Sequence, residues 1–181
     1  GKLGSIDMDR LTFSTRIGVC ALSWKGRLLT GFRLPEIVGG EAISEGEKGP
    51  PDSVEPGEVS EWIRELVSKI QLHLDGVPQD FSNVSLDWSA VGEFQRAVYQ
   101  QTLAIRSGST TSYGEIARRM RLGPEAARAA GVALGKNPWP LIVPCHRVVA
   151  ASGKMTGFSA PGGVRTKTRL LAIEGAELSL D

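Results

Sequence analysis

The most reactive chemistry in the chain belongs to a cysteine that is followed by two basic side chains, in the run Pro144-Cys145-His146-Arg147-Val148. A lone cysteine after a short apolar run is most often just a small buried hydrophobic residue. His146 and Arg147 change that interpretation, because a base and a fixed positive charge beside a thiol lower its pKa and favour the thiolate at neutral pH. The sequence therefore predicts that Cys145 is a nucleophile.

A Cys/His pair does not by itself define the reaction. It would suit a peptidase, an acyl-transfer enzyme or an acceptor of alkyl groups. A metal site has less support, because Cys20, His73, Cys145 and His146 are all the Cys and His residues of the chain and show no paired ligand spacing. We expect no metal, no cofactor, and two reduced thiols rather than the disulfide of a secreted scaffold.

The composition is that of an ordinary globular protein: 181 residues, of which 41% are hydrophobic and 23% charged. This length suffices for two small domains, which we place at residues 8–85 and 86–181, and residues 1–7 have the look of a cloning remnant before Met8. No run approaches the roughly eighteen apolar residues of a membrane span, and the first residues lack a signal-peptide stretch. We therefore expect an intracellular protein with no membrane partner, in the cytoplasm of a prokaryote or the nucleus of a eukaryote.

The net charge of +1 is unevenly distributed along the chain. Residues 1–85 hold nine Lys/Arg and thirteen Asp/Glu, a balance of −4, whereas the remainder holds twelve against seven, a balance of +5. Neutralised phosphates supply most non-specific affinity for nucleic acid, so contacts with DNA or RNA are expected in the second half. On charge alone, an uninformative surface imbalance is equally compatible with these numbers.

The elements that must position Cys145 begin with a predicted hairpin. Residues 12–34 alternate in polarity and are rich in β-formers, with strands expected at 17–22 and 28–32 around a turn at 24–27. Residues 38–59 are rich in Gly, Pro, Ser and Glu, which predicts a mobile loop.

A helix is expected next, because apolar residues recur at four-residue spacing and form one stripe that would cover the sheet: Trp62, Leu66, Ile70 and Leu74. Residues 75–78 end this helix, and residues 79–89 are expected to be an extended connection. The following helix should turn Phe94, Val98 and Leu103 toward the core and end at Ser107-Gly108.

Two short helices are predicted after that point. Ser112 and Glu115 have the spacing of a capping box that opens a helix running through Met120. Residues 121–123 form a turn, and Pro124 suits the first position of a second helix that ends at Gly135. Together they make a helix-turn-helix candidate with the second helix in the recognition position.

The second of these helices has an unusual surface, because Arg128 is the one long side chain in a group of small residues: Ala126, Ala127, Ala129, Ala130 and Gly131. Small residues permit close approach to another helix or to the floor of a minor groove about 6 Å wide. Periodicity alone favours helix packing, since alanine is a good helix former and a common core residue.

Five motifs together make the resemblance specific. They are Ser112-Tyr113-Gly114-Glu115-Ile116-Ala117, Ala126-Ala127-Arg128-Ala129, Gly135-Lys136-Asn137-Pro138, Pro144-Cys145-His146-Arg147-Val148 and Leu170-Leu171-Ala172-Ile173-Glu174-Gly175. In order and spacing, residues 94–178 resemble the O6-alkylguanine-DNA alkyltransferases, also called methylated-DNA–protein-cysteine methyltransferases. The resemblance implies an α/β two-domain protein, with an antiparallel sheet and helix of ribonuclease H-like outline followed by a mostly helical, winged-helix-like half. The N-terminal half resembles the family only in that outline.

The resemblance also implies the partner and the reaction. Double-stranded DNA carrying O6-alkylguanine, and also O4-alkylthymine, would be bound through its minor groove by a monomer. The damaged base would be flipped out, because its alkyl carbon is otherwise buried in the stack, and the alkyl group would pass irreversibly to Cys145 in a single turnover.

Roles for individual residues follow from the same resemblance. Arg128 would fill the space left by the base, while Ser112 and the small residues of the recognition helix contact DNA. Tyr113 would assist phosphate rotation and donate a hydrogen bond or proton to the departing guanine. Asn137 would be a hinge whose amide bonds backbone groups on both sides, and Glu174 would orient His146, which reaches Cys145 through a water.

The guanine pocket is expected to be lined by Pro140, the Val148 carbonyl and Ser159. The chain departs from the family's usual residues at Phe158, Ala160-Pro161 and Trp139, and these departures leave the range of accepted alkyl groups open. Two other classes compete with the alkyl acceptor. A damage sensor that binds the lesion but lacks the cysteine is disfavoured by Cys145, and a Cys/His hydrolase would need an oxyanion site for which the sequence gives no sign.

Overall fold

The computed structural model describes residues 8–35, 37–38, 41–42, 59–152 and 163–176. Its N-terminal half holds a three-stranded antiparallel sheet in the order β1-β2-β3, with β1 Asp9–Thr15, β2 Gly18–Lys25 and β3 Leu28–Arg33. The predicted hairpin is confirmed as β2 and β3, and Gly26 makes its turn with φ of +56°. Strand β1 was not predicted as a separate strand, because it has few apolar residues, and these are only half-buried.

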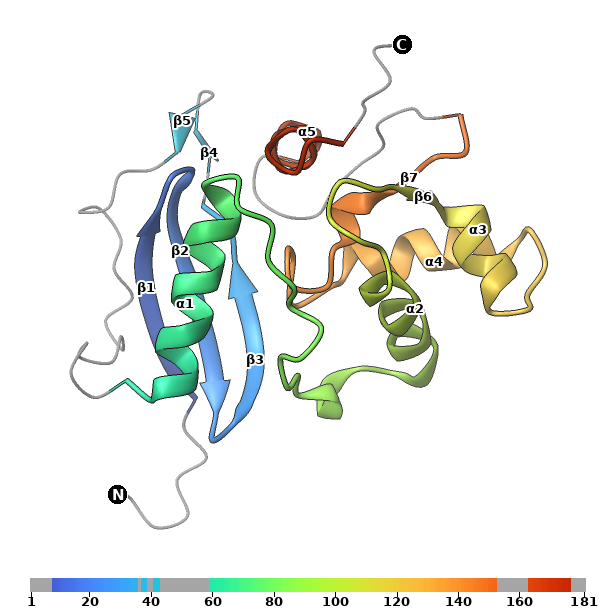
Figure 1. The fold of residues 1–181 in the computed structure, drawn as a ribbon. Helices are drawn as coiled ribbons and strands as arrows, with labels where there is room; N and C mark the ends of the chain where they lie inside the picture. The colour runs from blue at the N-terminus through green and yellow to red at the C-terminus, as the bar shows by residue number, and fades with distance from the viewer. Residues whose placement is uncertain (1–7, 36, 39–40, 43–58, 153–162, 177–181) are drawn as a thin grey trace.

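Helix α1, Glu61–Leu74, lies across one face of this sheet (Figure 1). The predicted apolar stripe is confirmed, since Leu66, Ile70 and Leu74 are buried and Trp62 packs against the same core. Gly76, with φ of +96°, follows the end of the helix as expected. Within the predicted loop, the two-residue strands β4 Ile37–Val38 and β5 Glu41–Ala42 pair with each other. Most of that loop, like residues 1–7, lies outside the described residues.

The extended connection between the halves joins the edge of the sheet at β3. Leu29 donates its backbone N–H to the Ser85 carbonyl at 2.8 Å and accepts from the backbone N–H of Asp87 at 2.9 Å. A short 3-10 turn, η2 Trp88–Ala90, then leads into the second half.

The described residues of the second half form four α-helices: α2 Glu93–Leu103, α3 Tyr113–Arg119, α4 Ala126–Gly135 and α5 Val164–Ile173. The strands β6 Thr111–Ser112 and β7 Val148–Val149 pair in parallel and join α3 to the cysteine segment, which is the 3-10 turn η3 Cys145–Arg147. The prediction that Phe94 faces the core is wrong, because its side chain is 37% exposed. At the first turn of α2 that position points to solvent, and Val98, Tyr99 and Thr102 form the buried side instead.

Helices α3 and α4 pack against each other through the predicted turn (Figure 1). The Ser112 hydroxyl caps α3 by accepting from the backbone N–H of Glu115 at 3.0 Å. The Glu115 carboxylate bonds Arg118 and Arg119, one turn further along its own helix. Helix α4 begins at Ala126, two residues later than predicted, because Pro124 still belongs to the turn.

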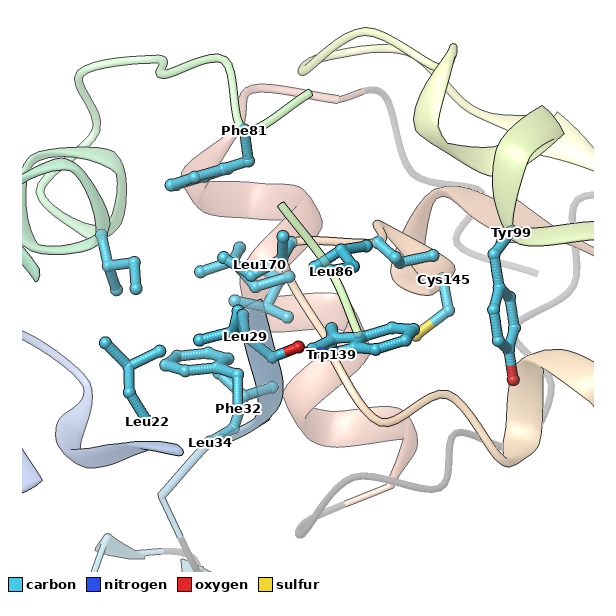
Figure 2. Close-up of a cluster of buried hydrophobic side chains, with 14 of the residues drawn as sticks. Leu22, Leu29, Phe32, Leu34, Phe81, Leu86, Tyr99, Trp139, Cys145 and Leu170 are labelled. Atoms are coloured by element: carbon cyan, nitrogen blue, oxygen red, sulfur yellow. Dashed lines mark hydrogen bonds between the residues drawn. The ribbon is translucent and has the colours of Figure 1, made fainter. Parts of the chain in front are cut away.

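One cluster of buried residues runs through both halves. Figure 2 shows Leu29 and Phe32 of β3 on one side of the Trp139 ring, with Cys145 and Tyr99 on the other. The fold is therefore a mixed α/β structure in which a small antiparallel sheet and a group of helices share a core. No helix in the described part of the chain is long and apolar enough to cross a bilayer.

Candidate active site

Cys145 sits at the start of η3, at the end of a tight loop that Asn137 holds closed. The Asn137 side-chain amide donates to the Val143 carbonyl at 2.8 Å, and its oxygen accepts from the backbone N–H of Trp139 at 2.9 Å. Leu141 within the loop has φ of +78°, an unfavourable conformation for a residue with a side chain. Asn137 therefore braces a strained connection between α4 and the cysteine. Both of these backbone partners, Trp139 and Val143, follow Asn137 in the chain, so the amide closes the loop rather than bonding groups on both sides of the residue.

The Cys145 thiol is buried, with 4% of the residue exposed. Burial raises the pKa of Cys145 to about 11, although a hydrogen bond with Asn137 and the charge of Lys167 act in the opposite direction. The prediction that His146 and Arg147 generate a thiolate is wrong in this resting state, because both side chains are bonded to Glu174 instead. Cys145 is consequently a protected thiol that needs a base when it reacts.

His146, the next residue, has one ring nitrogen bonded to Glu174 and the other without a partner in the described residues. Its Nε2 lies 2.9 Å from Glu174 Oε2, so that Nε2–H donates a hydrogen bond to the carboxylate. In this tautomer of the neutral ring, Nδ1 carries the lone pair. Nδ1 is buried and bonds nothing else in the described ranges. The pKa of His146 is lowered, chiefly by burial and further by the charge of Arg147, so its ring is neutral near pH 7.

Glu174, at the C-terminal end of α5, gathers more partners than the sequence indicates. Arg147 donates to both carboxylate oxygens, at 2.9 Å from Nε and 2.8 Å from Nη2, and also to the Ile105 carbonyl at 2.7 Å. His73 of α1 lies 2.8 Å from Oε2. Burial raises the pKa of Glu174, but the hydrogen bonds from His146, His73 and Arg147 outweigh it, and the net pKa is well below its ordinary value. The group is therefore a carboxylate.

Lys167 of α5 also lies in the site, although it was not among the site residues predicted from the sequence. It is 1% exposed, and its ammonium donates to the Val148 carbonyl at 2.8 Å and to the Tyr113 hydroxyl at 3.4 Å. Tyr113 and the Val148 carbonyl are thus brought together as predicted, with a buried cation between them. A signal was present, since Lys167 lies three and four residues before Leu170 and Leu171 on the apolar side of a helix.

The small residues of α4 divide between packing and exposure. Ala130 is buried, which fits helix packing, whereas Arg128 and Ala129 are exposed and Ala126 and Ala127 are half-buried. A Cβ added to Gly131 would lie 3.7 Å from the ring of Tyr113, which is an ordinary van der Waals contact, so Gly131 packs beside this tyrosine. The exposed side of the helix therefore carries Arg128 and Ala129.

The expected pocket is only partly described. Pro140 is buried, and Trp139 is fully buried, with its indole N–H donating to the Leu29 carbonyl at 2.9 Å. Trp139 therefore packs against the sheet (Figure 2). Ser159, Phe158 and Ala160 lie outside the described residues. In the part of the chain that is described, no three Cys, His, Asp or Glu side chains form a group that could hold a metal ion.

Known proteins with similar sequences decide the family. Residues 93–176 match the family model of the 6-O-methylguanine DNA methyltransferase, DNA binding domain. A methylated-DNA–protein-cysteine methyltransferase of Mycobacterium tuberculosis is 37% identical over 170 residues, which are 94% of each chain. The chain belongs to this family. The relative from Methanothermobacter thermautotrophicus is 41% identical over 116 residues, which span 63% of that protein's length.

The fold of this methyltransferase family member agrees with solved structures. The crystal structure of Mycobacterium tuberculosis OGT in complex with DNA superposes with a TM-score of 0.72 at 35% identity, covering 92% of both chains. The O6-methylguanine-DNA methyltransferase from Pyrococcus kodakaraensis, at 21% identity and a TM-score of 0.60, shares the fold. Cys145, His146, Tyr113, Asn137 and Glu174 all lie within the stretch that matches the family model.

Proposed function

We propose that this chain repairs DNA directly, as a methylated-DNA–protein-cysteine methyltransferase that takes the alkyl group from O6 of guanine, and also from O4 of thymine, onto Cys145. The observation that carries the proposal is a buried thiol in a member of this family, followed by a histidine whose second nitrogen is bonded to a buried carboxylate. This is the series of orienter, base and nucleophile that an otherwise weak nucleophile requires.

The reaction can be written from these groups. His146 Nδ1 takes the thiol proton through a bound water, while Nε2 stays bonded to Glu174. The sulfur attacks the alkyl carbon, the C–O bond breaks, and its electron pair leaves with the guanine. The Tyr113 hydroxyl donates a proton to the base as this charge develops, and recovers one from the imidazolium through solvent. Overall, the thiol loses one proton and the repaired guanine gains one, while His146 and Tyr113 return to their starting states and the cysteine ends as a thioether.

A thioether has no good leaving group, so the alkylated Cys145 is not regenerated and each molecule acts once. The burial that raises the pKa of the resting thiol fits this single use. Because the resting thiol is buried and protonated, it reacts slowly with other electrophiles.

For DNA we propose that α3 and α4 act as a helix-turn-helix of winged-helix type, with α4 in the minor groove. Its exposed small residues would allow close approach, and Arg128 would occupy the place of the flipped nucleotide. Ser112 and Pro140 would contact the DNA backbone and the base. We assign the N-terminal half a ribonuclease H-like outline, and expect a monomer in the compartment that holds the genome.

The proposal is tested by mixing the protein with duplex DNA that carries a single O6-methylguanine and measuring the masses of its proteolytic peptides by mass spectrometry. We expect the peptide containing Cys145 to gain one methyl group, with the yield limited to one per protein molecule. Cys20 is an internal control, since it lies in β2 of the N-terminal sheet, away from the helices proposed to bind DNA, and must stay unmodified. The variant Cys145→Ala should bind the same DNA and accept nothing. An unmodified Cys145 after complete mixing would exclude the alkyltransferase function.

A further inference from the structure

Glu174 receives hydrogen bonds from both halves of the molecule. His146 and Arg147 approach it from the cysteine segment, and His73 approaches it from α1 in the N-terminal half. The His73 side chain is 1% exposed, as is that of Glu174. The packing of α1 does not require a buried histidine that bonds the carboxylate beside His146, since the other buried residues of this helix are apolar.

The proton position on His73 follows from its two partners. Its Nδ1 accepts from the backbone N–H of Gln79 at 3.0 Å, so Nδ1 carries no proton and Nε2 does. The proton on Nε2 then points to Glu174 Oε2 at 2.8 Å. The edge of the Phe81 ring, 5.3 Å away between centroids, holds the imidazole from the side. His73 is therefore a neutral ring with one fixed donor.

Glu174 Oε2 accepts three donors, from His73 Nε2 at 2.8 Å, His146 Nε2 at 2.9 Å and Arg147 Nη2 at 2.8 Å. Each donor draws some of the negative charge of this oxygen. The more of that charge His73 takes, the less the carboxylate pulls the ring of His146 toward its protonated form. His73 thereby acts on His146 through the oxygen that they share.

We propose that His73 is a positioning residue for alkyl transfer: it fixes the Glu174 carboxylate so that His146 keeps a neutral ring with Nδ1 turned to the reaction. This rests on the proposed function of the site. It gives the N-terminal half a share in the chemistry, since α1 supplies the third donor to the carboxylate.

A metal ion is the other occupant that two imidazoles and a carboxylate could suggest. Here both oxygens of Glu174 are bonded by the Arg147 guanidinium, whose positive charge repels a cation. The nitrogens of His73 and His146 that face Glu174 carry protons rather than the lone pairs that a metal needs. The cluster is therefore built for hydrogen bonds.

The first test is the nitrogen NMR spectrum of the full chain labelled in histidine, which contains only two imidazoles. The variant His73→Gln assigns them by removing one set of signals. We expect both rings at pH 7 to carry the proton on Nε2 and none on Nδ1. A spectrum in which His73 carries its proton on Nδ1, or on both nitrogens, would overturn the proposal independently of any rate measurement.

The second test follows the rate of methyl transfer from saturating methylated duplex DNA as a function of pH in a single turnover. The acid limb of this profile reports the protonation of His146, which faces Glu174, Arg147 and His73. The variant His73→Phe keeps a ring beside Phe81 but removes the donor, so the carboxylate pulls harder on the proton of His146. We expect the acid limb to move to higher pH by about one unit. At a given pH on that limb, the variant should then transfer the methyl group about tenfold more slowly than the wild type.

Two controls separate positioning from mere packing. The variant His73→Gln offers an amide donor to Glu174 and should return the acid limb most of the way to the wild-type pH. The variant Phe81→Leu loosens the same contact without touching Glu174, and should lower stability while leaving the acid limb in place. An acid limb in His73→Phe that coincides with the wild-type one overturns the proposal. A wild-type protein that transfers no methyl group refutes instead the proposed function on which it rests.

Discussion

Replacing Glu174 by glutamine tests the architecture of the site most directly. The glutamine keeps the shape of the side chain but loses the charge. Its amide N–H group faces at least one of the N–H donors that bond the carboxylate, and two donors cannot bond each other. Arg147, whose side chain is 7% exposed, is then a buried cation without its counter-charge. Removing one member of a buried ion pair costs about 3–5 kcal/mol of unfolding free energy. For a chain of this size that corresponds to a melting temperature lower by roughly 6–20 °C.

The matched control is Glu115→Gln, because Glu115 also bonds two arginines, Arg118 and Arg119, but at the surface. Solvent already screens that group, so the same substitution should leave the unfolding free energy almost unchanged. Urea unfolding of both variants gives the comparison. The double variant Glu174→Gln/Arg147→Met should recover part of the loss, since the stranded charge is gone. Equal stability losses in Glu174→Gln and Glu115→Gln would show that our account of the buried carboxylate is wrong.

Three further predictions concern the reaction centre. Because the pKa of Cys145 is raised to about 11, its modification by a small thiol reagent should be slow at neutral pH. The modification rate should rise about tenfold per pH unit up to pH 9, and Cys145→Ala should lower it about tenfold at a given pH, because the pKa of the remaining thiol, Cys20, is raised to about 12. Asn137→Ala, which strands two backbone partners, should cost about 2–4 kcal/mol in urea unfolding; a loss near zero would show that the loop needs no brace. Arg128→Ala should slow repair of duplex DNA more than reaction with a free alkylated base, and equal losses would remove its assigned place in the duplex.

Periodicity and capping patterns predict the local elements well. The four-residue spacing of apolar side chains gives α1 its buried stripe, and Ser112 caps α3 as its spacing with Glu115 indicates. The errors have physical causes that local patterns do not contain. Phe94 is apolar, yet it occupies the first turn of α2 on the side away from the core.

The site itself depends on contacts that are far apart in sequence. His73 and Glu174 are separated by 101 positions, and neither has neighbours that mark it as a partner of the other. The pKa of Cys145 could not be predicted from His146 and Arg147 either, because adjacent residues in a 3-10 turn need not point to the same place. Their side chains go to Glu174, and burial then decides the state of the thiol. Only Lys167 carried an unused local signal, as a charge on an apolar helix face.

The contacts between the halves argue that the N-terminal half is part of the reactive site. Hydrogen bonds between the described residues join this half to the segment around the cysteine or to its carboxylate: His73 donates to Glu174, the Trp139 indole N–H donates to the Leu29 carbonyl, and the Phe32 backbone N–H donates to the Pro138 carbonyl. Two of them hold the loop that Asn137 closes, and the third holds the group that orients His146. If the halves separated, the Trp139 ring would be exposed and the loop with its strained Leu141 would lose its outer support. The geometry of the base and the thiol is therefore stabilised by the same core that joins the sheet to the helices.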